Sequence, residues 1–343
     1  MASDQQIGII GSGPAGLSAA LWLKNLGLQP WLIDSAERPG GLQNHNVLGN
    51  DWVLGQRNKT GRDIAAEFVA HLEEAAIPIT CHCTPLALHG TAGHFRIQLS
   101  QTAATGAHLH ERTCAALLIA TGTRPRAAEV LVGVPGVARL PVGRILYGPP
   151  AFADIDQAAG QRILIVGGGD NAFENARLLL AAGARVSMAL RSPPRAQTAQ
   201  TAPVLAAQAQ ARSHAQAHDG RCTLYQPARI TALAWQADAV QVQLDSVAET
   251  LTVDRLHILT GYEPNTAFLS TFLSGLQTTA TSFSLAEMLD SAGYLQVDAA
   301  GRTRMAGLYA AGDVCHPEFP SVVSALAQGA RAAKTIATDL SLP

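Results

Sequence analysis

The hydrophobic pattern opens with a short apolar run, which predicts a buried strand at Ile7–Ile10. A glycine-rich turn follows at Gly11–Gly16, and apolar residues at helical spacing then predict a helix from Leu17 to about Leu26. The next apolar run predicts a second strand at Trp31–Asp34. Strand, turn, helix and strand in this order are typical of a βαβ unit that binds a dinucleotide.

The same pattern returns in the middle of the chain. It predicts a strand at Arg162–Val166, a glycine-rich turn at Gly167–Ala172, a helix to about Ala182 and a strand at Arg185–Leu190. The Ala- and Gln-rich stretch 196–218 that follows is expected to be a surface helix. Two such units in one chain predict an α/β fold with two Rossmann-like dinucleotide-binding domains.

Two further apolar runs end in glycine, at Ala116–Gly122 and Arg255–Gly261, and they flank the second unit. We interpret them as the places where the chain crosses between domains. The predicted boundaries are therefore 1–123 and 256–343 for one discontinuous domain, with 124–255 as a domain inserted into it.

Composition narrows the possible functions. The chain has 343 residues, 48% hydrophobic and 15% charged, which is enough for two folded domains. A net charge of −2 argues against a nucleic-acid-binding protein. The apolar runs are too short to span a membrane, and the first residues do not resemble a secretory signal. Five scattered cysteines argue against a disulfide framework, so we expect a cytoplasmic protein.

The first glycine-rich turn has the spacing that a pyrophosphate requires. Its first glycine permits a tight turn, the second lets the backbone approach the phosphates, and the third lets helix and strand pack closely. Asp34 ends the second strand, where a carboxylate can bind a ribose diol. The alternative is a turn without a ligand. The candidate residues here are Gly11, Ser12, Gly13, Pro14, Ala15, Gly16, Asp34 and Ser35.

The second turn differs at the end of its following strand, which reads Ala189-Leu-Arg-Ser192. Arginine in this place suits a 2′-phosphate, which an acid would repel, so NADPH is favoured over NADH. The alternative is that Arg191 and Arg195 are solvated surface charges. The candidate residues are Gly167, Gly169, Asp170, Asn171, Ala172, Arg191, Ser192 and Arg195.

A third feature lies near the end of the chain. Gly312-Asp313 follows an apolar run, and a carboxylate in such a turn can accept a hydrogen bond from a polyol. Ser321 then opens a helix, whose first N–H groups suit an anionic edge such as that of a reduced flavin. The alternative is an ordinary turn and N-cap.

Together these motifs resemble the low-molecular-weight thioredoxin reductase family of flavoproteins. The resemblance extends over nearly the whole chain, and the order of its motifs is specific. The matching segments are Gly11–Gly16, Gly40-Gly-Leu-Gln43, Ala120-Thr-Gly122, Gly167–Ala172, Gly261-Tyr-Glu-Pro-Asn-Thr266 and Ala310-Ala-Gly-Asp-Val314.

The resemblance implies FAD in the first domain, completed by the C-terminal segment, and a nicotinamide coenzyme in the inserted domain. It implies that Asp313 binds the ribityl chain and that Ser321 and Val322 lie at the flavin pyrimidine. It also implies a homodimer. Further residues that it assigns to cofactor binding are Gly41, Leu42, Gln43, Gly122, Gly261 and Gly312.

The resemblance leaves alternatives open at three positions. Asn50 is a candidate flavin neighbour, whereas for Trp52 a buried structural role is favoured. Cys83 lies in a segment that passes the adenine in the family, and its alternative is a small buried residue.

One departure from the family concerns the acceptor. Thioredoxin reductases carry a Cys-x-x-Cys pair just before the second glycine-rich turn, but here that stretch, Arg144–Ala151, contains no cysteine. A dithiol relay to thioredoxin is therefore not expected. Cys81, His82 and Cys83 are too few ligands for a zinc site, so no metal is predicted.

These observations predict an NAD(P)H-dependent FAD oxidoreductase that passes a hydride from nicotinamide to flavin, and electrons on to a small molecule or small redox protein. No side chain is assigned as a catalytic acid or base, since the flavin carries the chemistry. One alternative is a ferredoxin or flavodoxin–NADP reductase. Another is a low-turnover nucleotide-binding flavoprotein with a sensor or structural role.

Overall fold

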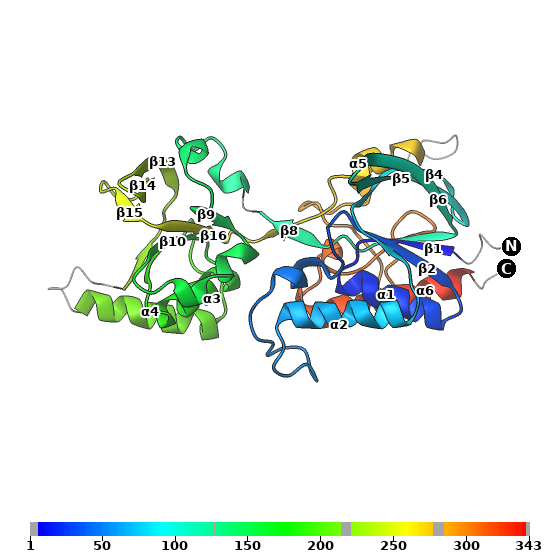
Figure 1. The fold of residues 1–343 in the computed structure, drawn as a ribbon, viewed down its shortest axis with the longest axis horizontal. Helices are drawn as coiled ribbons and strands as arrows, with labels where there is room; N and C mark the ends of the chain where they lie inside the picture. Colours follow the sequence, from blue (N-terminus) through cyan, green and yellow to red (C-terminus); the bar gives the residue numbers. More distant parts are fainter. Residues whose placement is uncertain (1–5, 127, 214–220, 277–284, 341–343) are drawn as a thin grey trace. The chain divides into compact units, whose positions relative to one another are not determined.

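The computed structural model describes residues 6–126, 128–213, 221–276 and 285–340 (Figure 1). The chain forms two compact units. Unit 1 joins Met1–Arg124 to Glu263–Pro343, and unit 2 is Pro125–Tyr262. The second division falls at Tyr262 and not at residue 255, because strand β16 (Arg255–Ile258) pairs in parallel with a strand of unit 2.

Unit 1 is built on a five-stranded sheet in the order β18-β7-β1-β2-β3, in which all neighbours run parallel. The short β-branched and apolar runs of the sequence form its central strands, which are buried on both faces, as parallel sheets require. The strands are β1 (Gln6–Ile10), β2 (Gln29–Ile33), β3 (Ile79–Thr80), β7 (Ala116–Ile119) and β18 (Leu308–Ala310).

Helices α1 (Pro14–Asn25), α2 (Gly61–Glu74) and α6 (Val322–Leu340) lie on one side of this sheet (Figure 1). Helix α1 begins before the predicted Leu17, because proline is well tolerated in a first turn. Helices α1 and α6 pack closely, since a Cβ at Gly329 would lie 2.1 Å from the Ala15 carbonyl oxygen. On the other side is an antiparallel sheet of β4 (Cys83–Thr91), β5 (His94–Ala103) and β6 (Gly106–Cys114).

Unit 2 repeats the arrangement with a parallel sheet in the order β12-β11-β10-β16-β9. Helices α3 (Asp170–Ala181) and α4 (Thr198–Ser213) cover one face (Figure 1). The predicted helix at 196–218 thus starts close to where it was expected, and residues 214–218 lie outside the described part of the chain. The remaining strands are β9 (Ile145–Tyr147), β10 (Arg162–Val166), β11 (Arg185–Ala189), β12 (Cys222–Tyr225), β13 (Ile230–Gln236), β14 (Ala239–Leu244) and β15 (Leu251–Val253).

The two apolar runs predicted as crossings are interior strands of their sheets. Strand β7 lies between β18 and β1, and β16 lies between β10 and β9. The chain passes between the units just afterwards, through β8 (Thr123–Pro125) and β17 (Tyr262–Pro264), which pair with each other. The short helical elements are η2 (Gly41–His45), η3 (Ala128–Leu131), η4 (Val137–Arg139), η5 (Pro149–Phe152), η6 (Ile155–Gln157), α5 (Leu269–Phe272), η7 (Ser274–Leu276), η8 (Leu285–Glu287) and η9 (Asp313–Cys315).

Candidate functional site

In the first glycine-rich turn, a side chain would clash with the backbone at the first and third glycines. A Cβ at Gly11 would lie 2.3 Å from the Ala120 carbonyl oxygen, and φ is 107° there. A Cβ at Gly16 would lie 2.0 Å from the Gly11 carbonyl oxygen. The turn therefore brings the start of α1 against β1 and β7, and the first N–H groups of that helix lack helical partners.

Asp34 closes this turn from the end of β2. Its Oδ2 accepts hydrogen bonds from the Ser12 backbone N–H at 2.7 Å and from the Ser12 hydroxyl at 2.6 Å. Its Oδ1 accepts one from the Ala36 N–H at 2.9 Å. A carboxylate has about four acceptor positions, so roughly one remains for a ribose hydroxyl. Ser35 is exposed beside it.

Asp313 lies just after β18, in the first turn of η9. Its Oδ1 is buried and has no hydrogen-bond partner in the described chain. Burial raises the pKa of this carboxyl. A buried acceptor without a partner costs about 1–3 kcal/mol, so this atom is suited to a donor from a bound molecule. The adjacent Gly312 N–H donates to Gln328 on α6 at 2.9 Å.

The start of α6 is capped as the simpler alternative predicted. The Ser321 hydroxyl accepts from the Ser324 N–H at 3.1 Å, and the helix begins at Val322. An N-cap of this kind satisfies one N–H and leaves others of the first turn free, so it is compatible with an anionic group at this position.

The segment after β2 contains a close contact between the two glycine motifs of unit 1. A Cβ at Gly41 would lie 2.9 Å from the Gly13 Cα, so the start of η2 packs directly on the backbone of the first glycine-rich turn. Leu42 is partly buried, and the Gln43 side-chain oxygen accepts from Asn46 at 3.3 Å.

The side chain of Asn50 is hydrogen-bonded within its own loop, and its place beside the flavin stays a prediction. Its amide donates to the Val53 and Gln56 carbonyls, and its Oδ1 accepts from the Trp52 and Val53 N–H groups. These bonds use its side-chain polar groups to shape a loop. The expectation of a buried Trp52 was wrong, because the side chain is 82% exposed.

Cys83 is fully buried in an apolar cluster of unit 1, and its N–H donates to the Asp34 carbonyl at 2.8 Å. Burial raises the pKa of this thiol. The side chain therefore fills space next to the turn as a small apolar residue, and only its backbone lies at the edge that Asp34 forms.

The second glycine-rich turn repeats the geometry of the first. A Cβ at Gly167 would lie 2.1 Å from the Leu259 carbonyl oxygen, whereas nothing lies within 4 Å of a Cβ at Gly169. The open space at Gly169 is where a ligand can approach the backbone. Ala172 is buried against the sheet, and the Asn171 amide donates to the Tyr262 hydroxyl at 3.3 Å.

The structure brings the basic segment after β11 against this turn. The Arg195 N–H donates to the Gly168 carbonyl at 2.8 Å, and the Gln197 N–H donates to Asp170 Oδ1 at 2.7 Å. Arg191, Ser192 and Arg195 are exposed. The contact through Asp170 was not predicted, because a sequence does not show which backbone group a carboxylate binds.

Gly122 and Gly261 follow β7 and β16 at the same edges of the two sheets. Added Cβ atoms would meet nothing within 4 Å at either glycine. The Gly122 carbonyl accepts from the Asn265 N–H at 3.0 Å, and the Gly261 carbonyl accepts from the Arg126 N–H at 2.9 Å.

A sequence profile of the pyridine nucleotide-disulphide oxidoreductases matches residues 5–329. The chain belongs to this family. Members of the family are FAD-dependent oxidoreductases that use NAD(P)H, so the predicted resemblance to thioredoxin reductase-like flavoproteins is confirmed. The predicted α/β class with two Rossmann-like domains is confirmed as well.

Individual relatives agree with this assignment. The thioredoxin reductase of Coxiella burnetii is 25% identical over 350 residues, covering 95% of this chain and 93% of that protein. The ferredoxin–NADP reductase of Ralstonia nicotianae is 29% identical over 187 residues, covering 53% of this chain and 50% of that protein. The thioredoxin reductase structure from Lactococcus lactis, in its FR conformation, shares the fold with a TM-score of 0.75 at 22% identity, covering 98% of both chains. Several other matches span only 40–51% of the relative's length.

The cysteines of this chain bear on the path of the electrons. The five cysteines contain no Cys-x-x-Cys spacing, and all five are free thiols. Burial raises the pKa of each one, to about 12 for Cys114 and Cys315 and to about 11 for Cys222. A thiol is nucleophilic only as the thiolate, so none of them is activated.

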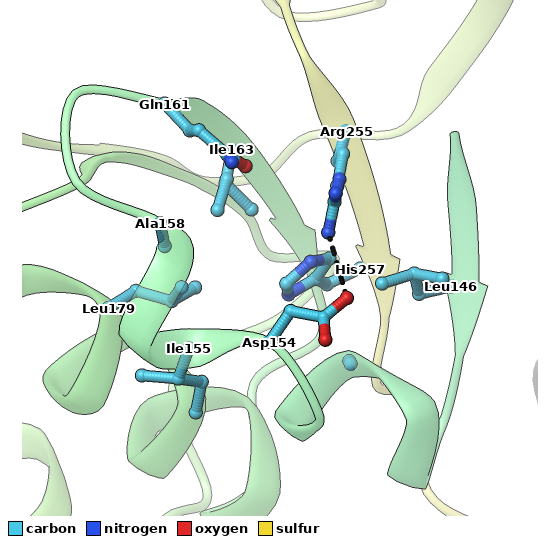
Figure 2. Close-up of a pocket in the computed structure, with 10 residues that line it drawn as sticks. Leu146, Asp154, Ile155, Ala158, Gln161, Ile163, Leu179, Arg255 and His257 are labelled. Carbon is cyan, nitrogen blue, oxygen red and sulfur yellow. Dashed lines mark ion pairs between the residues drawn. The ribbon is translucent and has the colours of Figure 1, made fainter. Parts of the chain in front are cut away.

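Unit 2 also contains a buried histidine on β16, where His257 pairs in register with Ile165 of β10 (Figure 2). His257 Nδ1 bonds Asn175 Oδ1 at 2.8 Å, and the Asn175 amide donates to the Ala151 carbonyl at 2.9 Å. Among the described residues, His257 Nε2 is buried without a hydrogen-bond partner. It lies beside a small cavity of about 10 Å³. Arg255 and Asp154 form an ion pair next to it at 3.5 Å. Burial lowers the pKa of His257 to about 4, so the ring is neutral at pH 7.

Within the described residues, no group of three or more His, Cys, Asp or Glu side chains could hold a metal ion. Those residues also include no helix that is long and apolar enough to cross a membrane.

Proposed function

We propose that this chain is an NADPH-dependent FAD oxidoreductase that delivers electrons to its acceptor without a dithiol of its own. The observation that carries the proposal is Asp313 Oδ1, which is buried without a hydrogen-bond partner among the described residues of unit 1. Both glycine-rich turns also keep the close backbone contacts that only glycine allows. When bound, FAD and NADPH supply the hydride chemistry, and the protein supplies binding and orientation.

Unit 1 is proposed to hold FAD. The first turn of α1 binds the pyrophosphate, because its free N–H groups and helix dipole attract anions. Asp34 offers its remaining acceptor position to the ribose, and Asp313 accepts a hydroxyl of the ribityl chain. The N-terminus of α6, at Ser321 and Val322, stabilises negative charge at the flavin pyrimidine.

Unit 2 is proposed to hold NADPH. Its glycine-rich turn offers open backbone at Gly169 to the pyrophosphate. Arg191 and Arg195 lie on the segment that contacts this turn, and their guanidinium groups suit a 2′-phosphate. The strand that precedes them does not end in an acid, which removes the feature that would favour NADH.

The acceptor is proposed to be a small molecule or a small redox protein. The raised pKa values of all five thiols support an electron path that does not use cysteine. The similarity to a ferredoxin–NADP reductase supports, as a second candidate, reduction of ferredoxin or flavodoxin. A homodimer in the cytoplasm stays a prediction.

Anaerobic stopped-flow spectroscopy tests the proposal. The purified chain should bind FAD, and NADPH should bleach the flavin absorption faster than NADH does. A colourless chain that refuses FAD, or a flavin that neither coenzyme bleaches, would overturn it. Cytochrome c reduction that rises when ferredoxin is added would select the second candidate.

A further inference from the structure

We propose that Asp170 is a positioning residue for coenzyme selectivity, which holds the basic segment 191–197 against the second glycine-rich turn. This inference rests on the proposed binding of NADPH to unit 2 and deepens it. It changes the role of Asp170 from a cofactor ligand, as the sequence predicts, to a residue that acts on the 2′-phosphate through the protein backbone.

The first support is a pair of hydrogen bonds that join the segment to the turn. Asp170 Oδ1 accepts from the Gln197 N–H at 2.7 Å across 27 positions of the chain. The Gly168 carbonyl accepts from the Arg195 N–H at 2.8 Å. The two bonds lie on either side of Ala196, so the segment is held at two points. The bond to the carboxylate is charge-assisted and short, which makes it the stronger type.

The second support is electrostatic. Asp170 is the first residue of α3, the helix whose N-terminus faces the expected pyrophosphate. A carboxylate there repels phosphates and is therefore not suited to be a ligand of the pyrophosphate. The bond to Gln197 turns one of its oxygens toward the protein, so the acid at this position is better explained by a structural contact than by a contact with the coenzyme.

The third support is the state of the two arginines. Arg191 and Arg195 are exposed, and neither guanidinium has an ion-pair partner in the part of the chain that the structure describes. They are therefore free to bind an anion. Fixing their backbone in advance lowers the entropy lost when that anion binds. Without the Asp170 bond, the hydrogen bond from the Arg195 N–H to the Gly168 carbonyl remains.

The test compares Asp170→Ala with Asp170→Asn, whose side-chain oxygen can still accept from Gln197. Asp156→Ala is the control, because Asp156 is an exposed acid of unit 2 outside the proposed site. We expect Asp170→Ala to raise the KM for NADPH about tenfold, as loss of one charge-assisted hydrogen bond implies, and the KM for NADH less than about twofold. The rate of flavin reduction at saturating coenzyme should not change. Asp170→Asn should keep the NADPH to NADH ratio within about twofold of the wild type.

Hydrogen exchange of the protein without coenzyme provides an independent readout. The Gln197 amide should exchange faster in Asp170→Ala than in the wild type, and Asp156→Ala should leave it unchanged. Equal rises in both KM values, or faster exchange without a change in selectivity, would overturn the positioning role. Calorimetry of the wild type with 2′,5′-ADP and 5′-ADP tests NADPH binding separately. Equal affinities for the two nucleotides would overturn NADPH binding and the positioning role with it, even if hydrogen exchange confirms the bond between Asp170 and Gln197.

Discussion

The two glycine-rich turns have the same backbone but opposite arrangements of charge. In unit 1, Asp34 ends the second strand and bonds back onto the turn through Ser12. In unit 2, that strand is followed by arginines, and the acid is instead Asp170 at the start of the helix, bonded to Gln197. A carboxylate beside the ribose disfavours a 2′-phosphate, whereas arginines favour it. In the proposed function, the shared turn therefore binds the pyrophosphate in each unit, and these few charges select the nucleotide.

The two units also differ in their buried polar atoms without partners. Asp313 Oδ1 of unit 1 lies at the edge where the cofactor is expected. His257 Nε2 of unit 2 lies beside a cavity with space for about one water molecule (Figure 2). The unpaired oxygen of Asp313 is thus suited to a bound ligand, whereas the unpaired nitrogen of His257 is suited to an internal water molecule.

The largest effect is expected from alanine at the first turn. Gly11→Ala forces a Cβ to 2.3 Å from a carbonyl oxygen at a φ of 107°, whereas nothing lies within 4 Å of a Cβ at Gly169. Urea unfolding without cofactors should show a loss of about 3 kcal/mol or more for Gly11→Ala. Gly169→Ala should lose less than about 1 kcal/mol. Equal losses would contradict the different packing at these two positions.

Asp313→Ala should lower the affinity for FAD roughly 100-fold, because the ribityl hydroxyl loses a buried charged acceptor. Fluorescence titration of the apoprotein measures this. Stability without FAD should not fall, since the substitution removes an unpaired buried oxygen. Unchanged FAD affinity would show that Asp313 Oδ1, like His257 Nε2, does not contact the cofactor.

Acid should destabilise unit 2 through His257. The folded ring has a pKa of about 4, below the ordinary value of 6.5, so the unfolded chain takes up a proton that the folded state excludes. The contribution of the neutral His257 ring to the free energy of unfolding is complete above pH 6.5 and is lost as the pH falls toward 4. Between pH 7 and pH 5 we expect a loss of about 2 kcal/mol in urea unfolding. His257→Gln, which cannot titrate, should lack this part of the pH dependence, and an identical profile would contradict the assignment.

Arg195→Ala should raise the KM for NADPH roughly tenfold and leave that for NADH nearly unchanged, because only the 2′-phosphate loses a partner. Arg139→Ala, which removes an exposed arginine of unit 2 away from the turn, is the control. A similar loss with both coenzymes would mean that the arginine does not distinguish the two nucleotides.

The smallest effect is expected from blocking the thiols. Alkylation at neutral pH should change electron transfer to the acceptor by less than about twofold, because the raised pKa values keep the thiols protonated and unreactive. Steady-state turnover before and after iodoacetamide treatment measures this. Strong inactivation would show that a cysteine takes part after all.

The fold and both turns could be predicted because their signals are local. Glycine spacing, short apolar strands and the acid or arginine at a strand end all lie within about 30 residues. The missed features are hydrogen-bond pairings that no spacing motif encodes. His257 meets Asn175 across 82 positions, and Asp170 meets Gln197 across 27. Trp52 was misjudged for a related reason, since a large apolar residue is usually buried, but the loop that Asn50 organises exposes it.

The close packing of α6 on α1 has a consequence for how the protein is made. Unit 1 needs β18 and α6 to complete its sheet and cover its first helix, so its early segments cannot finish folding until β18 and α6 have left the ribosome. Unit 2 is continuous and can fold while synthesis goes on. The nascent protein should therefore complete unit 2, proposed to bind NADPH, before unit 1, proposed to bind FAD.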